Sequence, residues 1–260
     1  MAAPGFSSRF KAAGYLLGFA LGGFFDGILL HQILQWHHLL AGLQGEGWQD
    51  LRVQILADGL FHALMYAVAV IGLVLLWRAR ADLGGEPADR LLFANVLLGF
   101  GFWHVADGVL SHWVTGIHRV KMDSPHALMW DLIWFFAFGL IPLAVGWWVR
   151  RSVTMAGMSH GRWAGILLAG AVLGGGVVSV LPAPGLTQSV VYFRPGTTAE
   201  QVFAAAAAVD ARIVWVDRSG ELWVFDFAHA SRAKALYRHG ALFVGNSLLP
   251  AGCISWSRAS

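Results

Sequence analysis

Aspartate and histidine recur at matched positions in the apolar N-terminal part of this sequence. Two units, 81 positions apart, each contain one aspartate followed by two histidines at the same spacing: Asp26, His31 and His37, then Asp107, His112 and His118. Ionisable side chains are costly inside apolar segments, so their repetition argues against accident. Neutral imidazole is the commonest protein ligand of transition metals. The pattern therefore predicts one metal site that is built from two copies of a unit.

A second repeated segment adds methionine to the pattern. The segment His62-Ala63-Leu64-Met65 returns as His126-Ala127-Leu128-Met129, and each copy is expected near the start of a helix. Residues three apart lie on one helix face, so each histidine has a thioether beside it. Thioethers are soft ligands, which makes Met65 and Met129 candidate ligands and favours copper over zinc or iron.

The candidate ligands and their supporting groups come from four helices. Seven histidines form the ligand set: His31, His37, His38, His62, His112, His118 and His126. At about 100° per residue, Asp26 falls on a different helical stripe from His31, and Asp107 from His112. This predicts that the aspartates orient imidazoles through the second ring nitrogen. The supporting set comprises Asp26, Asp58, Asp107 and Asp131.

Several functions remain open for such a set. The plainest is structural, with polar side chains that hydrogen-bond between helices. A second is the binding or delivery of a metal ion. A third is catalysis on a lipid-soluble substrate by a metal centre with an open coordination position. A fourth is haem held by two axial side chains, as in b-type membrane cytochromes.

The composition indicates where these residues lie. Apolar residues make up 57% of the chain, charged residues 13%, and the mean hydropathy is +0.60, as in polytopic membrane proteins. Five segments are long enough to cross a bilayer: about 12–40, 55–77, 91–117, 125–149 and 163–181. Residues 12–77 and 91–149 form the two repeat units. We therefore expect an all-α membrane bundle at 1–181, with an internally repeated four-helix core and one extra transmembrane helix.

The distribution of basic residues sets the expected orientation. Eight Lys and Arg residues fall on the side of the N-terminus: Arg9, Lys11, Arg78, Arg80, Arg90, Arg150, Arg151 and Arg162. Only Arg52, Arg119 and Lys121 fall on the other side. The positive-inside rule then predicts a bacterial inner-membrane protein with a cytoplasmic N-terminus and a periplasmic C-terminal domain. The helical rise places the histidines at the periplasmic end. The net charge of +3 reflects this topology, and we expect lipid rather than nucleic acid as the partner.

The composition changes at a proline-rich linker, residues 182–187. Beyond it, the pattern predicts strands at 188–193, 211–217, 221–227 and 241–245, and helices ending near 209 and 239. A capping box from Thr197 to Glu200 is expected to open the first of these helices. This β-α-β-β-α-β order is typical of an α+β ferredoxin-like domain, here at 188–260. Cys253 is the only cysteine, which excludes an internal disulfide.

The string from His31 to His38, HQILQWHH, resembles a bacterial family of uncharacterised predicted multi-pass membrane proteins that carry an HQxLQWHH string. The resemblance covers roughly residues 10–150. Members are often encoded near genes for cytochrome oxidase assembly or copper handling. It therefore implies copper as the metal, and a respiratory oxidase or a copper-handling protein as the partner. The resemblance carries no established ligand assignment.

Overall fold

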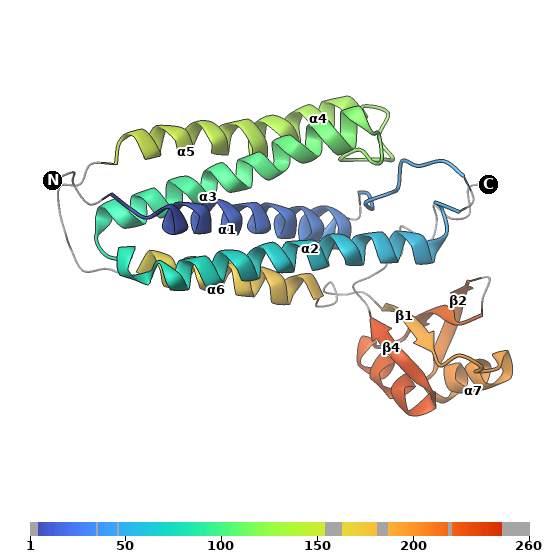
Figure 1. Cartoon of the computed structure of the whole chain (residues 1–260). Helices are drawn as coiled ribbons and strands as arrows, with labels where there is room; N and C mark the ends of the chain where they lie inside the picture. Colours follow the sequence, from blue (N-terminus) through green and yellow to red (C-terminus); the bar gives the residue numbers. More distant parts are fainter. Residues whose placement is uncertain are drawn as a thin grey trace.

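The computed structural model describes residues 5–34, 36–45, 47–153, 163–180, 187–217 and 220–245. The expected linker at 182–187 lies outside this part of the chain except for Thr187, and so does Cys253. Long helices form the N-terminal part, and a small sheet domain follows them (Figure 1).

Four segments are long and apolar enough to cross a membrane: Ser8–His31, Leu56–Arg78, Glu86–Val114 and Ala127–Arg151. They correspond to α1 (Ser8–Asp26) with η1 (Gly27–Ile33), α2 (Leu51–Arg78), α3 (Glu86–Asp107) with η3 (Gly108–Val114), and α4 (Ala127–Trp134) with η4 (Phe135–Leu140) and α5 (Ile141–Arg151). The first four expected membrane helices are thus confirmed as helices able to span. The fifth, α6 (Trp163–Val180), contains a shorter apolar stretch, Ala164–Val178.

Helix α1 lies between α2 and α3 (Figure 1), and the crossing of α1 and α3 is the tightest contact of the bundle. A Cβ atom added to Gly18 would overlap the backbone of Val96, and one added to Gly99 would overlap the backbone of Tyr15. Both glycines therefore let the two backbones touch. The two contacts are equivalent, since each residue of one lies 81 positions from its counterpart in the other.

Helix α6 packs against α1 and α2 and runs in the same direction as α1. Its start lies near Leu83, where Gly165 faces that side chain. Near its end, the Tyr66 hydroxyl donates a hydrogen bond to the Gly176 carbonyl. The chain therefore leaves α6 toward the end of the bundle that carries η1 and η3.

The C-terminal domain consists of β1 (Gln188–Phe193), α7 (Ala199–Ala208), β2 (Ala211–Val216), β3 (Leu222–Phe227), the 3-10 helix η5 (Ala230–His239) and β4 (Ala241–Gly245). Its four strands form one sheet in the order β2-β3-β1-β4, with every neighbouring pair antiparallel. The expected succession of strands and helices is confirmed for the described residues, with η5 as a 3-10 helix. Alternating apolar residues of β1 and β3 pack against α7 to form the core of the domain.

The expected capping box is wrong by one residue. Thr198 has an extended backbone and accepts the Gln201 N–H, while the Gln201 side chain accepts the Thr198 N–H. The Thr197 hydroxyl instead donates to the Arg194 carbonyl over 2.8 Å. Two adjacent threonines offer the same capping group, and the turn that precedes the helix decides which of them caps it.

Candidate metal centre

Both α1 and α3 change their hydrogen-bonding pattern directly after the repeated aspartate. Gly27–Ile33 and Gly108–Val114 form π-helical turns at equivalent positions. In the first, the Leu34 N–H donates to the Leu29 carbonyl over 2.8 Å. In the second, the Thr115 N–H donates to the Leu110 carbonyl over 2.9 Å. Such turns are rare and frequently occur at functional sites.

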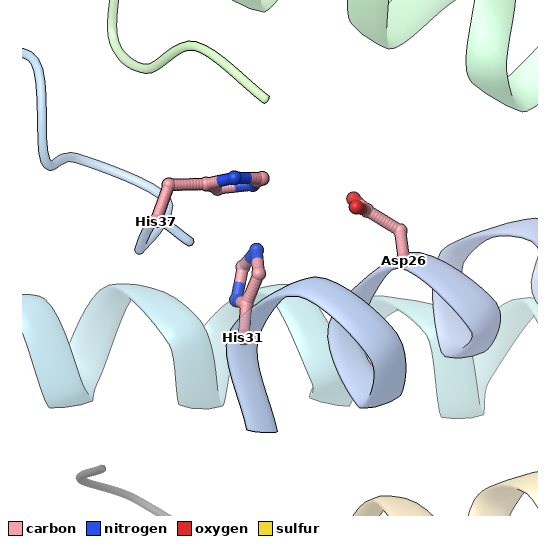
Figure 2. Close-up of side chains that lie close together, drawn as sticks. All are labelled: Asp26, His31 and His37. Carbon is pink, nitrogen blue, oxygen red and sulfur yellow. The ribbon is translucent and has the colours of Figure 1, made fainter. Parts of the chain in front are cut away.

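The π-helical turn gathers the first unit. Ligand atoms of Asp26, His31 and His37 lie within 4.8 Å of one another, and all three side chains are buried. Figure 2 shows the His31 ring and the Asp26 carboxylate projecting from one helix toward His37, which lies in the loop that follows. The expected separation of Asp26 from His31 on different stripes is therefore wrong. The prediction assumed a continuous α-helix, whereas i→i+5 bonding brings residues five apart onto one face.

The second unit repeats this arrangement. Ligand atoms of Asp107, His112 and His118 also lie within 4.8 Å of one another. The Nε2 atom of His112 is 3.1 Å from one Asp107 oxygen, and that of His118 is 3.6 Å from the other. His112 and His118 are each only 1% exposed. The two units thus place a carboxylate on the same side as imidazole Nε2 atoms.

The loops of the two units hold each other in place. The Nδ1 atom of His37 bonds the Val120 carbonyl over 2.9 Å, and that of His118 bonds the Leu39 carbonyl over 2.9 Å. A carbonyl only accepts, so Nδ1 carries the proton and Nε2 carries the lone pair. The two rings stack 4.4 Å apart with an interplanar angle of 6°. Burial, and then the neighbouring His118, hold the pKa of His37 well below its usual range, so His37 is neutral at pH 7.

Two further aspartates lie behind the imidazoles. The Nδ1 atom of His31 is 3.5 Å from Asp58, and that of His112 is 3.3 Å from Asp131. Asp58 also accepts the Leu39 N–H, and Asp131 the Val120 N–H, each over 2.9 Å. A carboxylate on the ring nitrogen that faces away from a site fixes the orientation of the ring. The geometry thus separates Asp58 and Asp131, which lie behind the rings, from the first two aspartates, which lie among the ligand atoms.

Buried imidazole nitrogens are left without hydrogen bonds at this site. Within the two Asp-His-His groups, the Nε2 atoms of all four histidines are inaccessible to solvent and make no hydrogen bond: His31, His37, His112 and His118. An unsatisfied buried polar atom costs about 1–3 kcal/mol. A bound cation would use these lone pairs, because neutral imidazole nitrogens are metal ligands.

His38 and Arg119 occupy equivalent places in the two loops. The Nδ1 atom of His38 is 2.5 Å from Asp58, and the Arg119 guanidinium donates to Asp131 over 2.8 Å. The sequence pattern predicts His38 as a ligand and gives Arg119 no part in the site. The spacing of 81 positions links the two residues and could have identified the role of Arg119.

The structure places His62 and His126, the histidines of the repeated His-Ala-Leu-Met segment, in different surroundings. The Nε2 atom of His62 lies beside Gly27, next to the cluster but outside the three groups of described residues that could hold a metal ion. The equivalent place beside Gly108 is taken by Phe135. His126 is exposed at the start of α4, where its backbone N–H bonds Ser124. His62 and His126 therefore do not lie in equivalent surroundings, although their sequence segments are the same.

The two methionines lie away from the imidazoles. The Met65 sulfur packs against Gly23 within the apolar core, and Met65 is fully buried there. Met129 is 47% exposed on the apolar surface of α4. A further histidine, His104, is buried, donates through Nδ1 to the Phe100 carbonyl over 2.9 Å and leaves Nε2 unbonded. Its position three residues before Asp107, on one helix face, was a signal in the sequence.

Together these features define a helical membrane bundle with buried Asp-His-His groups at one end. The chain belongs to the predicted membrane protein family DUF2243, whose model matches residues 13–153. The resemblance to an uncharacterised membrane protein family is thereby confirmed. The matched region contains both groups and excludes α6 and the sheet domain. Comparison with curated proteins and with solved structures found no match.

Proposed function

We propose that this protein binds a transition-metal ion through its Asp-His-His groups. The observation that carries the proposal is the set of unbonded, buried Nε2 atoms that converge on Asp26 and Asp107. A purely structural cluster would be expected to satisfy these nitrogens with donors, because each unsatisfied atom reduces stability. A cation supplies the missing partner for the imidazole lone pairs and the carboxylate charge together.

The proposed donors are nitrogen and carboxylate oxygen, a set that suits zinc, iron and copper(II). Copper is favoured by the family resemblance and, among the residues themselves, by the thioethers of Met65 and Met129. Neither sulfur belongs to the cluster, since one packs against Gly23 and the other is on the surface. The metal we propose is therefore a divalent transition ion, and the donor set by itself gives no preference for copper.

Haem fits the site poorly. Axial ligands of a haem lie on opposite faces of the macrocycle, whereas the rings of His37 and His118 stack directly on each other at 4.4 Å. The ring centroids of His37 and His112 are only 6.4 Å apart and the rings are nearly perpendicular. We therefore assign the cluster to a metal ion rather than to haem.

The proposed site supports two kinds of activity. Metal delivery to a respiratory oxidase or a copper-handling protein rests on the family resemblance alone. Catalysis by a membrane metalloenzyme on a lipid-soluble substrate has one specific observation in its favour. Each group supplies three protein donors, which leaves coordination positions open, as in catalytic metal sites. A delivery site should lose its ion readily, whereas a catalytic site should keep it through purification.

We place the protein in a bacterial inner membrane, with the N-terminus cytoplasmic and the metal site periplasmic. The basic residues support this orientation. Helix α6 would then be the fifth crossing and would bring the sheet domain to the periplasmic side. The strand order β2-β3-β1-β4 supports a ferredoxin-like fold for that domain. The sequence of this domain carries no sign of its own activity.

The experiment that tests the proposal is elemental analysis of the full-length protein, purified in detergent after growth in metal-supplemented medium. We expect the wild type to contain zinc, iron, manganese or copper, and a variant with His31→Ala and His112→Ala to contain none. His126→Ala is the matched control and should keep the metal. Size-exclusion profiles establish that each variant is folded. A folded wild type that contains no metal and takes up none from solution would overturn the proposal.

A further inference from the structure

We infer that the cluster holds two neighbouring metal ions, one in each unit of an internal repeat. The first ion would be bound by Asp26, His31 and His37, and the second by their counterparts Asp107, His112 and His118. This inference rests on the proposed function and specifies the number of ions and the role of each carboxylate.

The repeat is supported by reciprocal contacts and by the sequence spacing. His37 bonds the carbonyl of Val120, and the residues 81 positions away from each, His118 and Leu39, make the same bond in return. The backbone contacts at Gly18 and Gly99 are reciprocal in the same way. A twofold axis between α1 and α3 produces reciprocal contacts of this kind. An axis of this kind duplicates any site that lies to one side of it.

A third group of possible ligands overlaps the first. It contains His31, His38 and Asp58, whose ligand atoms also lie within 4.8 Å of one another. In the second unit the position of His38 is occupied by Arg119, which pairs with Asp131 and cannot bind a metal. Because its counterpart Arg119 is a cation that pairs with a carboxylate, His38 is assigned the role of neutralising Asp58. His38 and Asp58 are therefore positioning residues, and the number of ion sites is two.

The carboxylates have two distinct roles in this arrangement. Asp107 approaches His112 on its Nε2 side at 3.1 Å, whereas Asp131 approaches the same ring on its Nδ1 side at 3.3 Å. An imidazole binds a metal through one nitrogen and is oriented through the other. Asp107 and its counterpart Asp26 are thus assigned as ligands, and Asp58 and Asp131 as positioning residues.

The two sites adjoin each other. His37 of the first unit stacks on His118 of the second at 4.4 Å, and its ring centroid is 6.4 Å from that of His112. All of these rings are at least 96% buried, so one water-poor compartment encloses both groups. Paired ions in such a compartment can act on the same small molecule, as in two-metal sites.

The test is a titration of the full-length, metal-stripped protein in detergent with Co²⁺, followed by absorption and calorimetry. We expect two Co²⁺ ions per chain for the wild type and one for each of His31→Ala and His112→Ala. Asp26→Asn keeps the shape of the side chain and should also leave one tightly bound ion, which guards against a folding defect in the alanine variants. His126→Ala should bind two.

Electron paramagnetic resonance of the same samples loaded with Mn²⁺ tests whether the ions are neighbours. The wild type should give the broadened signal of a coupled pair, and His112→Ala the six-line signal of an isolated ion. One ion per wild-type chain, lost completely in either alanine variant, would overturn the two-ion inference while leaving the proposed function intact. Failure of the wild type to bind any Co²⁺ would refute the proposed function itself.

Discussion

Substitution of Gly18 by alanine tests the helix crossing that places the two units against each other. A Cβ at this position would overlap the Val96 backbone, and a backbone cannot move aside as a flexible side chain does. Gly59 in α2 is the matched control, because a Cβ there meets nothing within 4 Å. Alanine stabilises an unobstructed helix by about 0.5–1 kcal/mol relative to glycine. Overpacking typically costs about 1–3 kcal/mol.

The expected net effects have opposite signs. Gly18→Ala should destabilise the protein by about 1–2 kcal/mol after the helix-propensity gain is subtracted, whereas Gly59→Ala should leave it unchanged or stabilise it. For a protein of this size, each kcal/mol of stability changes the unfolding temperature by about 2–4 °C. The assay is tryptophan-fluorescence thermal unfolding in detergent. Equal unfolding temperatures for Gly18→Ala and Gly59→Ala would refute the inferred backbone contact.

Three further outcomes follow from the structure. Asp131→Asn should weaken metal binding by about 10–100-fold without changing the number of ions, because Asp131 lies behind the His112 ring. A complete loss of binding in calorimetry would contradict this role. In metal-free protein, the contribution of His37 to stability should fall as the pH drops below about 6.5, because its pKa is depressed in the folded state and the unfolded chain takes up a proton. His37→Asn should therefore lose less stability than the wild type between pH 7.5 and 5.5 in thermal unfolding, and an unchanged difference between the two pH values would argue against it. Thr198→Ala should destabilise α7 by about 1 kcal/mol and speed amide hydrogen exchange in its first turn, whereas Thr197→Ala should have a smaller effect. The reverse order of the two effects would favour a capping box that begins at Thr197.

The sequence was sufficient to predict the first four membrane helices and the sheet-domain elements, and it singled out the six residues of the two Asp-His-His groups. Helix length and apolar composition are local properties, and the spacing of 81 positions is visible without a structure. The positions of Asp26 and Asp107 beside the imidazoles were not predictable, because a regular α-helix puts them on a different face from His31 and His112. The π-helical turns that follow these aspartates bring residues five apart onto one face.

The equivalence of His62 and His126 failed for a related reason. Identical tetrapeptide patterns suggested a register, but the contacts of Gly27 and Gly108 align His62 with Phe135 instead. A similar sequence near the start of two helices does not determine which residues of each helix pack against the rest of the bundle. The two aspartates of α2 and α4, Asp58 and Asp131, mark the register better, because each bonds a backbone N–H in the loop of its own unit.

The most direct measurement of the central claim is X-ray absorption at the edge of the metal found in the purified protein. Ligation by the Asp-His-His groups predicts a first shell of nitrogen and oxygen at about 2.0–2.2 Å, with the outer-shell scattering of imidazole rings and no sulfur. The double variant with His31→Ala and His112→Ala should lose this signal. A sulfur shell at about 2.3 Å, or a first shell without imidazole scattering, would contradict the account.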